Sequence, residues 1–155
     1  MPTTLADFEA MVGTEIGVSD WLLIDQKRIA QFADATNDHQ WIHVDEERAR
    51  RELPTGKTIA HGYLTLSLIP CLTRGMLKIE GATRVINYGL NKVRFMTMVP
   101  VNSRVRARQK LVSVRERAGA IQTTNEITIE IEGEKRPACV AETIGLFFTG
   151  EEGAA

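Results

Sequence analysis

The stretch IAHGYLTLSLIPCLTRGM, residues 59–76, decides the fold class of this chain. It is the most apolar helical stretch in the sequence. Its apolar residues recur at helical spacing and form a wide stripe: Leu64, Leu66, Leu68, Ile69, Cys71 and Leu72. Pro70 lies inside it and should kink the helix or break one backbone hydrogen bond. A helix that is apolar nearly all round predicts burial on almost every side.

The part of the chain that could bury this helix follows it. After residue 82 the apolar residues alternate with period two, which predicts strands over 85–95, 103–117, 120–132 and 138–148. Long antiparallel strands after one buried helix require a sheet that wraps that helix. We therefore predict an α+β domain with a curved antiparallel sheet around one long central helix.

Shorter elements are predicted before residue 59. A helix over 4–12 should end at Gly13, and a short strand should cover 21–24. Asp25 should cap a helix over 26–36, and Asp45 should cap a second one that Pro54 ends. The segment ATNDHQWIHVDEE, residues 35–47, should form the loop between these helices.

Length and composition indicate one globular domain over residues 1–155, with its core over about 15–148. The hydrophobic content is 43% and the net charge is −1, so no global charge attracts nucleic acid or an anionic membrane. The N-terminus lacks the features of a signal peptide, and no apolar run is long enough to span a bilayer. We expect a cytoplasmic protein in which Cys71 and Cys139 are two buried thiols.

A stripe of basic residues follows one face of residues 103–117: Arg104, Arg106, Arg108 and Lys110. With a turn centred on Gly119, Arg108 would face Glu130 and Arg106 would face Glu132, while Leu111 meets Ile127 and Ala107 meets Ile131 on the other face. One register thus satisfies both faces, and it predicts solvated ion pairs. No stacking aromatics are interleaved with the arginines, so we do not expect a nucleic-acid surface.

The residues that could carry chemistry lie close together in the sequence. All three histidines fall within residues 39–61, and His43 lies five residues after Asp38. A carboxylate and an imidazole in one loop can hold a water and exchange its proton. Gly62 follows His61 at the start of the buried helix, where backbone N–H groups are free and no side chain blocks an approaching oxygen. These groups would suit addition of water to, or its removal from, a polarised carbonyl compound.

Each feature also has a simpler interpretation. The loop aspartate and histidine could only make turn and backbone hydrogen bonds. His61 and Gly62 could only start a helix. A metal site made of Asp38, His39, His43 and His61 is open on residue type alone, but the spacing fits no standard zinc pattern, and we expect no metal.

Two motifs resemble those of the MaoC-like family, which contains the R-specific enoyl-CoA hydratases and 3-hydroxyacyl-thioester dehydratases. The family motif Asp-x-Asn-Pro-(apolar)-His-x-Asp is similar to residues 38–45, DHQWIHVD, with Gln40 and Trp41 at the Asn-Pro positions. The family's (apolar)-Ala/Val-His-Gly segment is similar to IAHG, residues 59–62. With NYGLNKVRF at 87–95, the chain resembles the branch of nodulation protein N and the mycobacterial 3-hydroxyacyl-thioester dehydratases.

The resemblance implies a hot-dog fold and a hydro-lyase that adds water reversibly to trans-2-enoyl thioesters to give (3R)-hydroxyacyl products. Asp38 and His43 would hold the water, and the Gly62 N–H would polarise the thioester carbonyl. The substrate-binding residues would be Gly62, His61, Gln40, Asn87, Tyr88 and Gly89. The resemblance implies no cofactor, coenzyme A or acyl carrier protein as the substrate carrier, and a homodimer with acyl tunnels near its interface.

Two other functional classes stay open on the sequence. One is a hot-dog thioesterase, in which a carboxylate directs water at the thioester carbon itself. Asp38 and His43 argue against it, because typical hot-dog thioesterases lack a histidine in this place. The other is an acyl-thioester-binding subunit without activity. The sequence sets neither the acyl-chain length nor the carrier.

Overall fold

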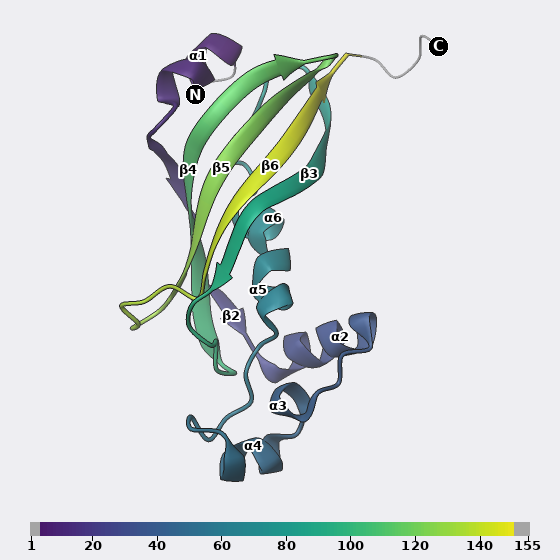
Figure 1. The fold of residues 1–155 in the computed structure, drawn as a ribbon, viewed down its shortest axis with the longest axis vertical. Helices are drawn as coiled ribbons and strands as arrows, with labels where there is room; N and C mark the ends of the chain where they lie inside the picture. Colours follow the sequence, from purple (N-terminus) through teal and green to yellow (C-terminus); the bar gives the residue numbers. More distant parts are fainter. Residues whose placement is uncertain (1–3, 151–155) are drawn as a thin grey trace.

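The computed structural model describes residues 4–150, in which all the described helices precede the four long strands (Figure 1). The helices are α1 (Leu5–Met11), α2 (Gln26–Thr36), α3 (Trp41–Val44), α4 (Glu46–Glu52), α5 (Gly62–Ser67) and α6 (Ile69–Leu72). The strands are β1 (Glu15–Val18), β2 (Leu22–Ile24), β3 (Ala82–Phe95), β4 (Ser103–Arg117), β5 (Ala120–Ile131) and β6 (Cys139–Thr149). None of the described helices is long and apolar enough to cross a membrane.

One antiparallel sheet contains the described strands in the order β1-β4-β5-β6-β3, and β2 also pairs with β4. The sheet curves around α5 and α6, while α2, α3 and α4 gather at one end of it (Figure 1). The predicted architecture, a curved antiparallel sheet around a central helix, is confirmed. β1 was not predicted, and it forms the edge opposite β3.

The central helix is shorter than predicted. It begins at Gly62 and not at Ile59, and the helix breaks at Leu68 into segments of six and four residues. Pro70 lies in the first turn of α6, where its missing N–H would have no intrahelical acceptor. The predicted interruption near Pro70 is confirmed, but the predicted length of the helix is wrong. Burial on nearly all sides is also wrong, because Tyr63, Pro70 and Cys71 are exposed.

Capping residues fix the starts of α2 and α4, as predicted. The Asp25 carboxylate accepts the N–H of Arg28 at the start of α2, and the Asp45 carboxylate accepts the N–H of Arg48 at the start of α4. α2 ends at Asn37 in the left-handed conformation, with φ of 56°. This reversal directs the chain into the segment that holds the candidate catalytic residues.

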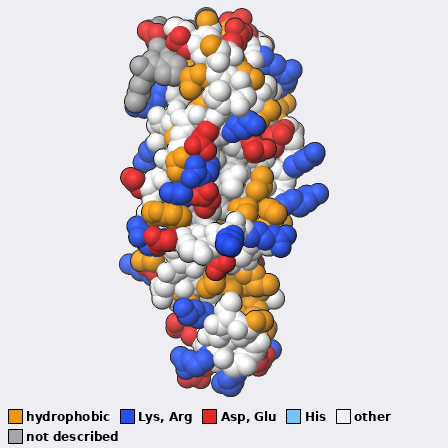
Figure 2. All heavy atoms as spheres, turned by 90° about the vertical axis from the view of Figure 1, so that its left-hand side faces the viewer, with side chains coloured by type: hydrophobic (Ala, Val, Ile, Leu, Met, Phe, Trp, Pro, Cys, Tyr) orange, Lys and Arg blue, Asp and Glu red, His pale blue; other side chains and the backbone are white. Residues whose placement is uncertain are grey.

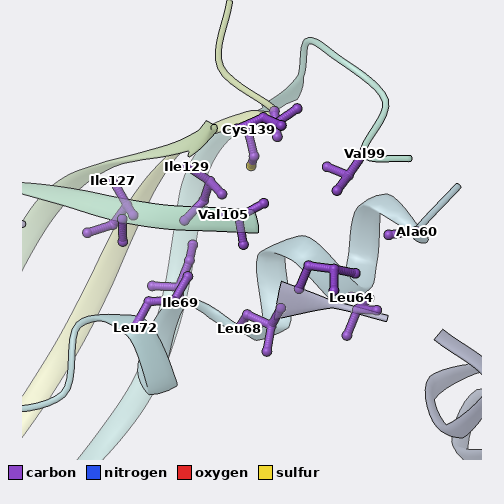
Figure 3. Close-up of a cluster of buried hydrophobic side chains, with 14 of the residues drawn as sticks. Ala60, Leu64, Leu68, Ile69, Leu72, Val99, Val105, Ile127, Ile129 and Cys139 are labelled. Carbon is purple, nitrogen blue, oxygen red and sulfur yellow. The ribbon is translucent and has the colours of Figure 1, made fainter. Parts of the chain in front are cut away.

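The hydrophobic core divides into two clusters. The larger, here called the main cluster, joins α2, α5 and α6 to the inner face of the sheet, with Leu64, Leu68, Val105 and Ile129 among its buried members (Figure 3). The smaller is the α1 cluster, which consists of Phe8, Ile79, Leu111 and Phe147. Cys139 belongs to the main cluster and its burial raises the pKa of its thiol to about 11. Burial of Cys139 is confirmed, whereas the predicted burial of Cys71 is wrong; both thiols are free.

The predicted register of β4 against β5 is wrong by one residue next to the turn and by two residues beyond the bulge. Arg106 faces Glu130, Ala107 faces Ile129 and Leu111 faces Asn125. Ala118 and Gly119 form the turn with φ of 32° and 79°, and Arg117 pairs with Ala120. A bulge between Leu111 and Ser113 then adds a further residue to β4. The sequence pattern contains no signal that placed this bulge.

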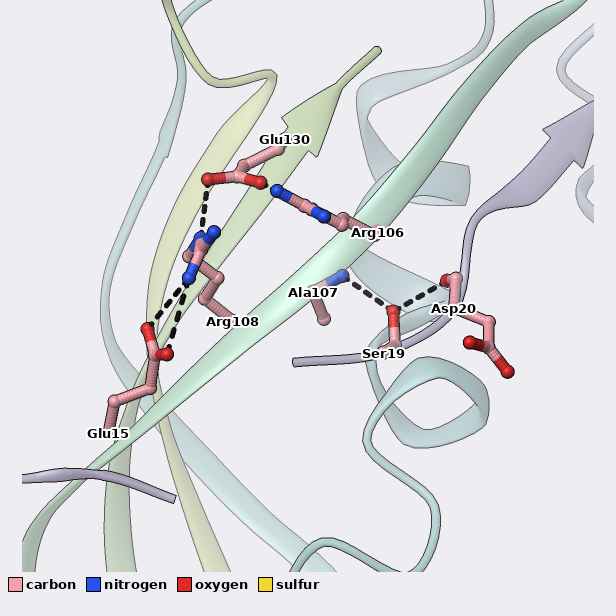
Figure 4. Close-up of polar contacts among 7 residues, drawn as sticks. All are labelled: Glu15, Ser19, Asp20, Arg106, Ala107, Arg108 and Glu130. Carbon is pink, nitrogen blue, oxygen red and sulfur yellow. Dashed lines mark hydrogen bonds and ion pairs between the residues drawn. The ribbon is translucent and has the colours of Figure 1, made fainter. Parts of the chain in front are cut away.

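The basic stripe on β4 nevertheless makes the predicted solvated ion pairs. Glu130 accepts hydrogen bonds from Arg106 and, diagonally, from Arg108, both at 2.6 Å, and Arg108 also contacts Glu15 of β1 (Figure 4). Glu132 pairs with Arg104, so the predicted pair of Arg106 with Glu132 is wrong. Acidic and basic side chains are interspersed on the face that carries these strands (Figure 2).

Candidate active site

The segment after α2 forms a tight turn and then a short helix, where the sequence predicted only a loop. The Asp38 N–H donates to the carbonyl of Ala33 at 3.1 Å and closes α2. One Asp38 carboxylate oxygen accepts from the N–H of Gln40 at 3.4 Å, as in an Asx turn. α3 follows over Trp41–Val44 and carries His43 on its buried side. The turn-forming role considered for Asp38 is therefore present, and it leaves the side chain half exposed.

His43 is buried, and one of its two ring nitrogens makes a hydrogen bond to the backbone. Its Nδ1 lies 2.6 Å from the carbonyl oxygen of Ile59, and a carbonyl can only accept, so Nδ1 carries the proton in the neutral ring. Nε2 is then the unprotonated, basic atom. Burial lowers the pKa of His43 below 6.5, and the neighbouring His61 also lowers it, against opposing effects of the Ile59 carbonyl and Asp38. The geometry thus holds a neutral imidazole that can accept a proton.

His61 contacts both His43 and Asp38. It is buried at the N-cap of α5, and its ring stacks on that of His43 with centroids 3.7 Å apart. Its Nε2 lies 3.0 Å from the backbone oxygen of Asp38, so Nε2 donates the hydrogen bond. Its Nδ1 is buried without a hydrogen-bond partner among the described residues. The sequence suggested substrate binding by His61 and gave no sign of these contacts.

The three side chains converge closely. A carboxylate oxygen of Asp38 and one ring nitrogen each of His43 and His61 all lie within 4.8 Å of one another. A water that makes two hydrogen bonds of about 2.8 Å can bridge groups up to about 5.6 Å apart, so one water can contact both Asp38 and His43. The same three groups also have the residue types and spacing to hold a metal ion. His39, the fourth residue of the metal interpretation, turns away and pairs with Asp34 at 2.8 Å.

Two further residues position His43, and sequence analysis missed both. Gln26, the first residue of α2, donates from Nε2 to the backbone oxygen of His43 at 2.8 Å. Its Oε1 accepts from the hydroxyl of the buried Thr58 at 2.5 Å. Thr58 precedes Ile59, whose carbonyl fixes the His43 ring. A polar pair that links α2 to this segment leaves no motif in the sequence, because its two members lie 32 residues apart.

A pocket of about 400 Å³ opens beside these residues and contains Gly62 in its wall. His43, Thr65 and Phe95 also line it. As the first residue of α5, Gly62 has an N–H with no acceptor inside the helix. A Cβ added at Gly62 would lie 3.1 Å from ring carbons of Phe95, which is a tight contact. His43 and Gly62 therefore line one pocket, whereas Asp38 and His61 are not among its lining residues.

The other predicted substrate-binding residues lie elsewhere in the single chain. The Gln40 side chain is exposed and makes no hydrogen bond to the described residues. Asn87 and Gly89 line a second, larger cavity, and Tyr88 is exposed with its hydroxyl accepting from Arg117 at 3.2 Å. The structure does not bring these β3 residues to the pocket of His43 and Gly62. Their substrate contacts stay a prediction.

The chain resembles known proteins over most of its length. The family model for the MaoC like domain matches residues 7–132. The chain is 53% identical to 3-hydroxyacyl-thioester dehydratase Z of Mycobacterium tuberculosis over 142 residues, which covers 91% of this chain and 93% of that protein. It is 51% identical to nodulation protein N of Rhizobium leguminosarum bv. viciae over 145 residues, covering 92% and 90%.

Solved structures agree on the fold. The R-hydratase PhaJ1 from Pseudomonas aeruginosa, unliganded, superposes with a TM-score of 0.71 at 19% identity, covering 97% of this chain and 91% of that one. The (R)-hydratase from A. caviae also reaches 0.71, at 22% identity, covering 86% and 94%. The curved sheet around a central helix is thus the hot-dog fold of these hydratases. Since the family model matches most of the sequence and the relatives share half of their residues with it, the chain belongs to the MaoC-like dehydratase family.

Proposed function

We propose that this protein is a 3-hydroxyacyl-thioester dehydratase, a hydro-lyase that reversibly adds water to trans-2-enoyl thioesters to give (3R)-hydroxyacyl thioesters. The name of the mycobacterial relative at 53% identity supports this activity. The observation that carries the catalytic assignment is the convergence of a carboxylate oxygen of Asp38 and a ring nitrogen of His43 within 4.8 Å, beside a pocket that is lined by His43 and Gly62. Those groups are the ones that such a reaction needs.

In the hydration direction, Asp38 and His43 hold one water between them. The Nε2 of His43 takes a proton from this water while its oxygen forms a bond to C3 of the enoyl chain. The electrons of the C2–C3 double bond move toward the thioester carbonyl. The Asp38 carboxylate stabilises the imidazolium that forms.

The Gly62 N–H acts on the other end of the conjugated system. The thioester oxygen gains negative charge as the enolate forms, and a backbone donor directed at this oxygen stabilises that charge. C2 then takes the proton back from the pair of Asp38 and His43, which returns to its starting charge. Dehydration is the same sequence reversed, with the proton removed from C2 and the 3-hydroxyl leaving as water.

The substrate would be carried as a thioester of coenzyme A or acyl carrier protein in the cytoplasm, and these steps call for no cofactor. We also propose a homodimer that joins through β3. This strand is an edge of the sheet, and several of its large apolar side chains are exposed: Val85, Ile86, Tyr88, Leu90 and Phe95. An apolar edge strand of this length favours pairing with another strand.

The test is to mix the purified protein with crotonyl-CoA and to follow the absorbance of the enoyl-thioester band. We expect this band to disappear and chiral analysis to find the (3R)-hydroxybutyryl product. Release of free thiol without hydration would indicate a thioesterase instead. Saturable binding with neither reaction would indicate a binding subunit without activity.

A further inference from the structure

A cavity of about 660 Å³ lies between the central helix segments and the inner face of the sheet, away from the pocket of His43 and Gly62. The helices contribute apolar side chains to its wall, and the strands contribute both apolar and polar ones. Its lining includes Leu66, Ile69, Val85, Gln109, Thr123 and Asn125. The cavity exists because α5 and α6 are short and cover only part of the sheet (Figure 1).

Three of the lining residues form a buried polar band on the inner face of the sheet. Gln109 on β4 donates from Nε2 to the side-chain oxygen of Asn125 on β5 at 2.9 Å, and Asn125 donates to the Thr123 hydroxyl at 3.2 Å. All three are less than a tenth exposed. A band of buried amides in the middle of an apolar sheet face is unfavourable unless its polar atoms are satisfied.

One atom of this band is not satisfied. The side-chain oxygen of Gln109 is buried and has no hydrogen-bond partner in the described part of the chain. Exchanging the oxygen and nitrogen assignments of both amides would leave the Gln109 nitrogen as the unpaired atom instead. A hydroxyl group can donate to the first and accept from the second, so it satisfies Gln109 in either orientation.

The cavity and the reaction pocket lie along the same helix. Gly62 opens α5, while Leu66 and Ser67, four and five residues later, line the cavity. At 1.5 Å per residue these positions are roughly 6–8 Å apart along the helix axis. A thioester bound at Gly62 with its acyl chain directed along α5 would reach the polar band with the distal part of that chain.

We infer that the cavity receives the distal part of the acyl chain and selects chains that carry a hydroxyl group at the level of Gln109. This inference rests on the proposed dehydratase function and narrows its substrate class to hydroxylated acyl thioesters of medium length. An unsubstituted chain leaves the Gln109 amide unpaired in an apolar environment, which costs binding free energy. A chain with a hydroxyl at that level restores the hydrogen bond.

The first experiment uses the wild-type protein and two matched series of trans-2-enoyl-CoA esters, from octenoyl to dodecenoyl, with and without a terminal hydroxyl. We expect kcat/KM for the hydroxylated ester to exceed that of the plain ester by about tenfold at the chain length that reaches Gln109, and less at other lengths. Hydration of crotonyl-CoA without any preference between the two series would overturn the inference and leave the proposed function intact. Inactivity toward every ester, crotonyl-CoA included, would overturn both.

The second experiment compares Gln109→Met with Gln122→Met. Gln122 is equally buried on β5 but lies outside the cavity lining, and its side-chain oxygen accepts from Arg115 and Arg117. Gln109→Met should abolish the preference for the hydroxylated ester, while Gln122→Met should keep it. A preference retained in a folded Gln109→Met protein would contradict the assignment. If that variant does not fold, the wild-type comparison still decides.

Discussion

The imidazole rings of His43 and His61 lie face to face, with centroids 3.7 Å apart and ring planes inclined by 23°. The stacked ring of His61 disfavours a positive charge on His43 in this buried site. Burial, and then this neighbour, lower the pKa of His43 below its ordinary value of 6.5. The stack therefore favours the neutral base that water activation needs.

The pH dependence of activity should reflect this. The acidic limb of kcat/KM for crotonyl-CoA hydration should have its midpoint below pH 6.5, since His43 must be neutral in the free enzyme. Stability should also decrease at acidic pH. The unfolded chain takes up a proton near pH 6.5 and the folded one only at lower pH, so the free energy of unfolding falls as pH drops below 6.5. An acidic limb above pH 6.5 would contradict the assignment of His43 as the base.

Removing either member of the catalytic pair should nearly abolish turnover. Asp38→Asn and His43→Asn should each lower kcat by at least about 100-fold. The asparagine amide at position 43 can still donate to the Ile59 carbonyl, so the fold should persist. The double variant should be little worse than either single one, because the two residues act on one water. Steady-state kinetics and circular dichroism test both points.

The matched controls are Asp34→Asn and His39→Asn, which make the same changes at an exposed pair beside the site. Both should keep wild-type activity. Near-wild-type kcat in Asp38→Asn and His43→Asn would remove these residues from the mechanism. Unfolding of both variants would instead assign them a purely structural role in closing the turn after α2.

Much of the fold could be predicted because it depends on local pattern. Period-two alternation located the four long strands, and Asp25 and Asp45 marked two helix starts. The strand register could not be predicted, because it depends on the exact position of the turn at Ala118 and Gly119 and on a bulge between Leu111 and Ser113. The helix break at Leu68 and the separate α1 cluster could not be predicted either. Both depend on how much of the sheet α5 and α6 cover, which is a property of the tertiary structure.

The candidate site was predicted in part for the same reason. Asp38 and His43 form a motif within six residues, and Gly62 lies beside a third histidine. The supporting contacts join distant segments: Gln26 to His43, and His61 to the backbone of Asp38. Neither contact has a sequence signature, since a backbone carbonyl can belong to any residue.

Metal removal should leave the enzyme active. The proposed mechanism uses the Gly62 N–H, and not a Lewis acid, to stabilise the oxyanion. Dialysis against a strong chelator should therefore keep crotonyl-CoA hydration within about twofold of the untreated protein. Activity that is lost on chelation and restored by zinc would favour a metal ion held by Asp38, His43 and His61.

Substitution at Gly62 should separate activity from stability. A Cβ at this position meets the ring of Phe95 at 3.1 Å, but that ring is 47% exposed and can shift. Gly62→Ala should change the free energy of unfolding by no more than about 1 kcal/mol. The same Cβ narrows the approach to the N–H, and kcat should fall by about 100-fold or more.

Phe95→Ala provides the control for this experiment. If the loss of activity in Gly62→Ala came only from displacement of the Phe95 ring, the double variant would recover it. We expect no recovery, because the added Cβ itself excludes the thioester oxygen. A stable Gly62→Ala protein with full activity would mean that the oxyanion donor lies elsewhere.

Assembly through β3 should be sensitive to charge on that strand. Light scattering at micromolar concentration should give twice the chain mass of 17.3 kDa for the wild-type protein. Ile86→Lys, at a side chain 45% exposed on β3, should shift the mass toward the monomer. Val112→Lys, at a side chain 37% exposed on β4, should remain dimeric. A wild-type monomer would exclude the proposed dimer.

The polar band of Gln109, Thr123 and Asn125 also has a consequence for cooperativity. It separates the α1 cluster from the main cluster, so the two ends of the sheet are stabilised by different apolar contacts. Sub-global opening that releases α1 from Leu111 and Phe147 would leave the main cluster intact. Gly62 lies between Ala60 and Leu64 of that main cluster. We therefore expect opening at the α1 end to leave the geometry of His43 and Gly62 unchanged.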